Sequence, residues 1–441
     1  MKAKLLTLYL LLSFLQNSTA QKDILQSGPM LGYADMFEVM IWVQSKKEAT
    51  VKIKYYDTEN PEIIFETDSV KTEKQKAFTA HLIADKVQPG KKYNYDLYIN
   101  GKKVKLNFET TFKTQPLWKW RTDPPDFSFA AGSGTYINEK AYDRPGEGYG
   151  GDYRIFESIA DKNPDFMLWL GDNIYLREPD WNTETGIFHR YTHTRSTKEM
   201  KRLLAKTNNY AILDDHDFGP NNSDKSFWNK NKTLNAFKLF WANPSYGTGD
   251  INAATTFFNR SDCDFFLLDN RSFRDPNNLI AENKTILGEK QKEWLKNALT
   301  YSEAKFKFVV MGGQFLTTGG NYEVYSNYGF SEERAEIINF IHTQNIKNVI
   351  FLTGDRHHSE ISVLKGVGKP AIYDITVSPL TSHHASANKN EINTLRVPGS
   401  LINKRNFSVF SVSGKEDNRI LIIKFYDSDG KLIYKYKITA E

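Results

Sequence analysis

The sequence predicts a small all-β domain followed by a larger α/β domain. Residues 21–116 alternate apolar and polar side chains over short segments bounded by turn residues, which is typical of β-strands. From about residue 127, short apolar runs alternate with segments whose apolar residues recur at helical spacing. The chain has 441 residues, 40% of them hydrophobic, so it is long enough to form two such domains.

Residues 1–20 have the pattern of a secretory signal. Lys2 and Lys4 precede an apolar stretch from Leu5 to Leu15, and small residues end at Ala20. This stretch is short for a membrane span, and no later apolar run is long enough to cross a bilayer. We therefore expect an exported mature chain, periplasmic or extracellular, without a membrane span.

The expected β-domain covers residues 21–116. Its strand patterns lie at 39–43, 51–56 and 93–98. Asn100-Gly101 separates two of the strand-like segments and is a strong hairpin signal. Pro89-Gly90 followed by this hairpin resembles the late strands of a fibronectin type III-like sandwich. No cluster of titratable side chains indicates a site here, and residues 117–126, rich in aromatic residues and proline, are expected to be a linker.

The expected α/β domain covers residues 127–441. Its strand-like apolar runs are 127–131, 166–170, 210–213, 265–268, 306–311 and 349–353, and its helix-like segments are 153–161, 289–299 and 332–342. From Phe407 the pattern returns to β, with a turn at Asp427–Gly430 between two strands.

Residues with functional side chains follow several of these apolar runs. Asp172 and Tyr175 follow the second run, Asp215 follows the third, and Asp355 and His357 follow the sixth. Loops at the carboxyl ends of strands in an open α/β sheet converge on one crevice, so these side chains are expected to meet. Carboxylates packed that closely cannot all ionise without cations between them. The sequence therefore predicts a metal site with more than one ion, and oxygen ligands favour hard cations whereas a phenolate favours ferric iron.

Each motif taken alone has another interpretation. Gly171-Asp172 and Gly354-Asp355 also suit strand-end turns, and Asp214 and Asp217 also suit solvated turn carboxylates. The repetition of ligand-type residues after successive apolar runs favours the metal site over these alternatives.

Three segments together resemble the PhoD-like alkaline phosphatase and phosphodiesterase family of the calcineurin-like metallophosphoesterases. They are LGDNIY at 170–175, LDDHDFGPNN at 213–222 and LTGDRHH at 352–358. The resemblance extends from about Phe127 to the C-terminus and implies an αββα sandwich. The β-domain also looks like one that commonly precedes such catalytic domains.

The resemblance implies a role for each predicted metal ligand. Asp172 would bridge two metal ions, and Tyr175 would bind one of them as a phenolate. Asp215, Asp355 and His357 would complete the two coordination shells. The implied cofactors are two or more metal ions, with Ca²⁺ expected among them.

Two further residues would act on the substrate. His216 would face the phosphate ester and stabilise or protonate the leaving oxygen. Arg271 lies in a segment similar to the family's Asp-x-Arg and would grip a phosphate oxygen. The alternative for Arg271 is a surface ion pair with Asp269 or Asp275.

One position departs from the family pattern. The family usually has Ser-Cys after the first strand, and the Cys thiolate binds iron, whereas this chain has Ser133-Gly134. Ferric iron therefore stays open, and we expect a site that is less exclusive for iron and that would retain more iron after Gly134→Cys. Cys263, the single cysteine, precedes another apolar run and is expected to pack in the core.

Other polar residues have a structural interpretation as well as a functional one. His189 and His193 have the i, i+4 spacing of a helical metal site but lack an acidic partner in that turn, so a structural or substrate-facing role is favoured. His383-His384 lies in a loop where adjacent side chains seldom share a metal. Asn221 and Asn222 either line the cleft or form a turn, and Gln314 is a candidate cleft residue.

These observations favour an exported metal-dependent hydrolase of small phosphate esters, in which a metal-activated hydroxide attacks phosphorus. The alternatives are a phosphodiesterase or phospholipase-type activity on diesters, and a non-catalytic binding protein on a phosphatase fold. The formal net charge of +5 is too small and too evenly spread for a nucleic-acid-binding protein. The single cysteine excludes an internal disulfide framework. We expect a monomer.

Overall fold

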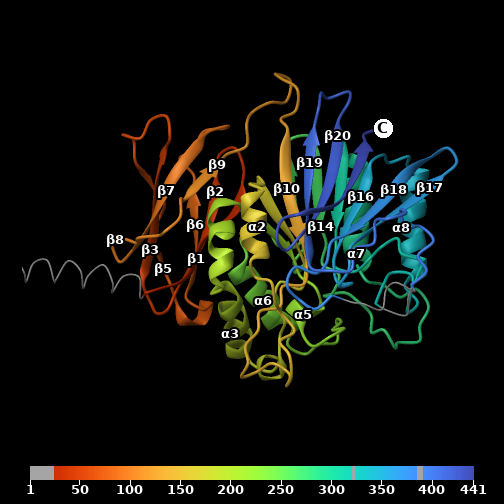
Figure 1. Ribbon diagram of the computed structural model, residues 1–441, viewed down its shortest axis with the longest axis horizontal. Helices are drawn as coiled ribbons and strands as arrows, with labels where there is room; N and C mark the ends of the chain where they lie inside the picture. Colours follow the sequence, from red (N-terminus) through yellow and green to blue (C-terminus); the bar gives the residue numbers. More distant parts are fainter. Residues whose placement is uncertain (1–23, 320–322, 385–390) are drawn as a thin grey trace, which may run out of the picture. The chain divides into compact units, whose positions relative to one another are not determined.

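The computed structural model describes residues 24–319, 323–384 and 391–441 (Figure 1). The expected signal, residues 1–20, lies outside the described residues. In the described part of the chain, no helix has both the length and the apolar character that crossing a membrane requires. The chain forms two compact units. The first comprises the described residues up to Leu117 with Arg195–Asn208, and the second comprises Trp118–Thr194 with Asn209–Glu441.

Two sheets around one core make up the β-strand part of the first unit, which confirms the predicted all-β region. One sheet has the order β1 (Leu25–Ala34), β2 (Val39–Ser45) and β6 (Thr79–Ala84). The other has the order β4 (Phe65–Glu66), β3 (Thr50–Asp57), β7 (Lys92–Ile99) and β8 (Lys102–Lys103), with β5 (Val70–Lys71) beside β3 and β9 (Thr111–Lys113) beside β7. A short 3-10 turn, η1 (Lys74–Lys76), precedes β6.

The period-2 pattern explains how these strands pack. Along β3 and β7 every second residue is buried, so that Val51, Tyr55 and Leu97 point into the shared core. Asn100 and Gly101 both have positive φ, 49° and 77°, as the predicted two-residue hairpin between β7 and β8 requires.

Residues 195–208 join the first unit although they lie far beyond residue 126. They contain η3 (Lys198–Met200) and α4 (Lys201–Lys206). Asn208 Nδ2 donates to the Gly32 carbonyl at 2.8 Å, and Tyr95 Oη donates to the Ala205 carbonyl at 2.8 Å. In the sequence this segment falls within the expected α/β domain, residues 127–441. Its local pattern gives no sign that its partners are strands of the β-domain.

The second unit contains two six-stranded sheets. The first has the order β12 (Asn208–Ile212), β11 (Phe166–Leu170), β10 (Phe127–Gly132), β19 (Asn406–Ser413), β20 (Ile420–Asp427) and β21 (Leu432–Thr439). The second has the order β13 (Thr256–Arg260), β14 (Cys263–Leu267), β15 (Phe306–Val310), β16 (Val349–Thr353), β18 (Lys369–Thr376) and β17 (Glu360–Gly366). All six predicted apolar runs are strands, and β14, β15, β16 and β18 pair in parallel.

Helices cover the outer faces of both sheets, which gives the αββα sandwich. The outer face of the second sheet packs against α7 (Glu289–Tyr301) and α8 (Ser331–Thr343) in one buried cluster that includes Leu295, Ile337 and Val309 (Figure 1). Trp169 of β11 contacts Phe156 of α2 (Ile155–Asp161) and Trp241, which follows α6 (Lys230–Phe240). The remaining helices are η2 (Glu178–Asp180), α3 (Glu184–Arg195) and α5 (Asp215–Phe218).

Phe129 of β10 lies where the two sheets face each other. Its ring stacks on Phe166 and Phe410 of its own sheet, and contacts Phe265 and Phe308 of the other sheet edge-on, with centroids 5.4 Å apart in both pairs. These ring contacts join the two sheets of the second unit.

We expect Phe129→Ala to lower the free energy of unfolding by about 3–5 kcal/mol, because a fully buried ring is lost and a cavity remains. Denaturant unfolding followed by circular dichroism measures this change. Phe257→Ala is the matched control, since Phe257 lies on the edge strand β13 and is 38% exposed. Equal losses for the two variants would show that Phe129 does not carry the packing between the sheets.

Candidate metal centre

The predicted metal ligands lie at the carboxyl ends of three strands. Asp172 follows β11, Asp215 follows β12 and begins α5, and Asp355 and His357 follow β16. β11 and β12 are neighbours in the first sheet, whereas β16 belongs to the second. The site is therefore assembled from both sheets of the sandwich, at strand ends far apart in the sequence.

Donor atoms converge in two groups that share Asp215. One group is Asp172, Asp215 and His216, and the other is Asp214, Asp215 and Asp355; in each group the donor atoms lie within 4.8 Å of one another. Asp214 was not among the predicted ligands, although it also follows an apolar run directly. His216 was predicted to face the substrate, and its ring is close enough to Asp172 and Asp215 to share an ion with them.

The backbone at the site is strained. Asp172, Asp355 and His357 all have positive φ, at 50°, 64° and 55°. Residues other than glycine adopt this left-handed conformation at an energetic cost, and such residues cluster at functional sites. The turns therefore hold these three side chains in place at the expense of local stability.

Tyr175 and His357 lie together beside Asp172. Tyr175 Oη donates to Asp172 Oδ2 at 3.2 Å and is 3.5 Å from His357 Nε2. The Nδ1 atom of His357 is held by the carbonyl of His383, which leaves Nε2 directed toward Tyr175. Burial lowers the pKa of His357 to about 4, so the ring is neutral near pH 7 and can bind a metal through Nε2.

The electrostatics of the site favour bound cations. Burial, together with neighbouring carboxylates, raises the pKa of Asp172 and of Asp355 well above the usual range. Burial also opposes ionisation of Asp215, but the charges of His216 and Arg271 lower its pKa below its ordinary value. Ions between these oxygens would remove the repulsion that raises the pKa of Asp172 and Asp355, and the donor set of carboxylate oxygens, a phenol and an imidazole fits hard cations or iron.

Arg271 orients Asp214. The Arg271 guanidinium donates through Nε to Asp214 Oδ1 and through Nη1 to Glu323 Oε2 at 2.9 Å, and Asn270 Nδ2 donates to the same Asp214 oxygen at 2.8 Å. The other oxygen of Asp214 is buried and has no hydrogen-bond partner among the described residues. At Gly312 a Cβ atom would lie 2.3 Å from Asp214 Cγ, so this glycine leaves room for the carboxylate. Asp214 Oδ2 is thus free to bind a cation.

The surface ion pair considered for Arg271 does not form. The side chain of Arg271 is 1% exposed, and its ion pairs are with Asp214, Glu323 and, at 3.9 Å from Nη2, Asp215. Asp269 instead accepts from the backbone N–H of Arg271 at 3.0 Å, and Asp275 pairs with Lys225.

His216 and Asp217 have different partners on the short helix α5. The ring of His216 lies 4.2 Å from that of Tyr175, centroid to centroid, and its backbone N–H donates to Asp172 Oδ1 at 3.3 Å. Asp217 accepts from the backbone N–H groups of Asn173 and Asp214. The carboxylate of Asp217 therefore stabilises the backbone of the two turns through Asn173 and Asp214, and these hydrogen bonds do not involve the ring of His216.

A family model described as PhoD-like phosphatase matches residues 129–415. The chain belongs to the PhoD-like phosphatase family. A second model, described as a domain of unknown function, DUF7800, matches residues 22–117. Among curated proteins, alkaline phosphatase D of Bacillus subtilis (strain 168) is 26% identical over 343 residues, which cover 65% of this chain and 54% of that protein. The chain thus spans about half the length of this curated relative.

Solved structures confirm the fold of this PhoD-like chain. A structure of PhoD matches with a TM-score of 0.75 and 18% identity, over 95% of this chain and 93% of the other. Purple acid phosphatase PPD1 from yellow lupin (Lupinus luteus) seeds matches with a TM-score of 0.66 and 10% identity, over 93% of this chain and 74% of the other. At these identities the likeness concerns the fold alone.

Cysteine is absent from the site of this PhoD-like chain. Cys263 is fully buried at the first residue of β14, whereas the site lies beyond the last residues of the strands. Gly134 has φ +75°, and a Cβ atom there would lie 2.8 Å from Ser382 Oγ. A cysteine at position 134 would have a strained backbone and would have to displace the Ser382 hydroxyl, which works against the gain in iron retention expected of Gly134→Cys.

The other candidate residues have structural partners. His189 pairs with Glu139, 50 residues earlier in the chain, at 3.0 Å. Gln314 is buried and donates to Glu360 Oε1 at 2.9 Å and to Thr376 Oγ1 at 2.8 Å. His383 contributes its carbonyl to His357, so this loop supports the site through its backbone.

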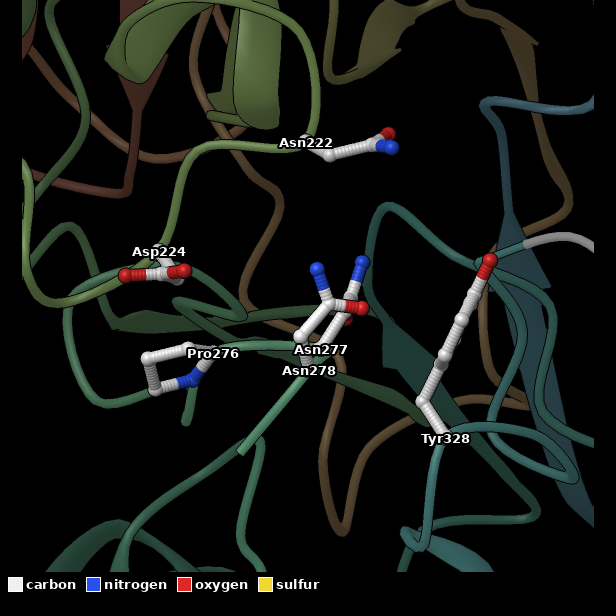
Figure 2. Close-up of a pocket in the computed structure, with 6 residues that line it drawn as sticks. All are labelled: Asn222, Asp224, Pro276, Asn277, Asn278 and Tyr328. Atoms are coloured by element: carbon white, nitrogen blue, oxygen red, sulfur yellow. The ribbon is translucent and has the colours of Figure 1, made fainter. Parts of the chain in front are cut away.

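A polar pocket of about 240 Å³ adjoins the metal centre. It is lined by Asn222, Asp224, Pro276, Asn277, Asn278 and Tyr328 (Figure 2). The backbone N–H of Asn222 donates to Asp215 Oδ2 at 2.6 Å, and Asn277 Nδ2 donates to Glu323, the partner of Arg271, at 3.0 Å. Figure 2 shows Asn222 across the pocket from Asn277 and Asn278, with Tyr328 to one side. Asn222 therefore connects the pocket with the metal centre.

Proposed function

We propose that this chain is an exported, metal-dependent hydrolase of phosphate esters. The observation that carries the proposal is the convergence of Asp172, Asp214, Asp215 and Asp355 in two donor groups. Tyr175 and His357 lie beside Asp172 and complete the proposed ligand set. Bound ions would supply Lewis acidity and a hydroxide nucleophile at neutral pH.

The side chains around the ions have distinct proposed roles. His216, partly exposed beside Tyr175, donates a proton to the oxygen that leaves phosphorus. Arg271 keeps Asp214 oriented through Nε. The proposed contact of Arg271 with a phosphate oxygen is through its Nη2 atom, 3.9 Å from Asp215 Oδ1, and requires the substrate to reach a side chain that is 1% exposed.

Hydrolysis of p-nitrophenyl phosphate and of bis(p-nitrophenyl) phosphate by the purified full chain tests this proposal. Turnover of either ester by the unmodified protein, lost in Asp215→Asn, would support it. Binding of the esters without turnover would favour the non-catalytic alternative, and the ratio of the two rates distinguishes monoester from diester preference. N-terminal sequencing of the mature protein tests export.

The polar pocket beside Asn222 is the proposed site for the alcohol part of the substrate. The lining is uncharged apart from Asp224, and Tyr328 offers a flat face. A diester has a second ester group that can enter such a pocket, whereas a monoester does not need it.

We expect Asn278→Trp to lower kcat/KM for bis(p-nitrophenyl) phosphate by about 10-fold, because the indole would fill part of the pocket. Asn278 is an exposed lining residue, so the substitution should leave the fold intact. Asn278→Ala is the control and should retain activity. If Asn278→Trp lowers the rates for monoester and diester equally, the pocket does not receive the second ester group.

We propose residues 127–441, apart from the segment 195–208 that joins the first unit, as the catalytic domain and residues 21–116 as a separate domain, with 117–126 as the linker. The ranges of the two family models, 129–415 and 22–117, support this division.

A further inference from the structure

One arginine lies directly between two of the proposed metal ligands. Arg356 follows Asp355 and precedes His357 in the loop after β16. Both of its neighbours have a left-handed φ, 64° at Asp355 and 55° at His357. A residue other than glycine keeps such a conformation only where the surrounding structure holds the backbone firmly. The loop therefore needs anchors outside its own short span to keep the two ligands in place.

The side chain of Arg356 is held by two segments outside this loop. Its Nη2 atom donates to Glu391 Oε2 at 2.7 Å, and its Nη1 atom donates to Gln314 Oε1 at 3.3 Å. These partners are 35 and 42 residues away in the chain. Gln314 is itself fixed, because its Nε2 atom donates to Glu360 and to Thr376. The guanidinium thus connects the ligand loop to both segments.

The ion pair between Arg356 and Glu391 is buried. The two side chains are 4% and 6% exposed. The second carboxylate oxygen, Glu391 Oε1, is also buried and has no hydrogen-bond partner among the described residues. Removing one member of a buried ion pair leaves the other charge without compensation, so such a pair strongly favours the conformation in which it forms. That conformation includes the strained backbone on either side of Arg356.

We propose that Arg356 is a positioning residue of the metal centre. This inference rests on the metal centre of the proposed function. The guanidinium contacts Glu391 and Gln314, neither of which is a proposed ligand, and Arg356 acts through the backbone that it shares with Asp355 and His357. Groups that hold metal ligands in one orientation raise the affinity for the ion.

The test measures binding of Co²⁺, a spectroscopic probe metal, to the metal-stripped full chain. Arg356→Met removes both guanidinium contacts and keeps a long side chain. We expect it to weaken Co²⁺ retention in dialysis against a mild chelator by about 10-fold. We also expect it to change the Co²⁺ absorption spectrum, because the ligands move. Arg356→Lys should recover part of the retention, since the ammonium keeps the charge opposite Glu391 but lacks the planar fork of the guanidinium.

A second variant tests the ion pair from its other side. We expect Glu391→Gln to weaken Co²⁺ retention as well. The double variant with Arg356→Met should lose no more than the weaker of the two single variants, because both changes act through one contact. Losses that add in full would show that the two residues act separately, and would overturn the inference.

Arg419→Met is the matched control for a loss of stability alone. Arg419 is a fully buried arginine that pairs with Asp262, with Nε 2.9 Å from Oδ2, and it precedes β20. Its removal also leaves a buried carboxylate without its partner, so the fold should be destabilised. Co²⁺ retention by the folded control should be unchanged. Equal losses of Co²⁺ from Arg419→Met and Arg356→Met would overturn the positioning role.

Unchanged Co²⁺ retention in a folded Arg356→Met variant would also overturn the inference. Where that variant does not fold, Glu391→Gln decides the question, and unchanged retention there would overturn it. Because the readout is metal binding, an unmodified chain that binds Co²⁺ but hydrolyses no ester would overturn the proposed function and leave this inference standing.

Discussion

Removal of bound cations with a strong chelator is expected to reduce ester hydrolysis to the background rate. The four carboxylates of the candidate centre lie too close together for all of them to stay ionised without cations, and burial with neighbouring carboxylates raises the pKa of Asp172 and of Asp355. Without ions the site also lacks a nucleophile that is active at neutral pH. We expect added divalent cations, Ca²⁺ among them, to restore the rate.

The chelator experiment has an independent physical readout. Because the pKa values of Asp172 and Asp355 are raised in the metal-free site, cation binding should release protons from these carboxyls. A fall in pH on adding Ca²⁺ to metal-stripped protein in weak buffer measures this release. The chelator already saturated with Ca²⁺ is the control, and full hydrolysis by protein shown to be metal-free would contradict the metal-dependent mechanism.

His216→Ala is expected to lower turnover by at least ~100-fold, the usual scale for a positioned general acid. The ring of His216 packs on Tyr175, and its backbone is anchored to Asp172, so the side chain is held beside the ions. We expect metal content to change little, because the proposed role of His216 is toward the substrate. Steady-state kinetics with metal analysis on the same preparation measures both quantities.

His189→Ala is the matched control for this variant. His189 is on α3 and is paired with Glu139, so its removal should leave turnover unchanged. Loss of metal from a folded His216→Ala protein would assign His216 to the ions, a role that its grouping with Asp172 and Asp215 also permits.

Much of the fold follows from local sequence patterns. The apolar runs that predict β10, β11 and β14 to β16 are strands, because a short run of large apolar residues is most stable when buried on both faces of a sheet. The hairpin at Asn100-Gly101 follows from backbone conformation alone, since both residues accept positive φ at little cost.

The location of the candidate site could also be predicted. Asp172 and Asp215 follow neighbouring strands of the first sheet, so their approach follows from strand order, whereas Asp355 follows β16 of the second sheet and meets them because the two sheets pack face to face. A residue's position after a strand is visible in the sequence, so these carboxylates could be named without coordinates.

The sequence by itself determined the order of the strands and helices, the α/β class and the carboxylates at the strand ends, because each of these depends on residues close together in the chain. Only the tertiary structure decided which distant groups meet. Glu323 pairs with Arg271, Ser382 fills the space beside Gly134, and residues 195–208 join the first unit. Such contacts depend on how separate segments pack around a shared core. Local periodicity and residue spacing therefore do not predict which of these segments meet.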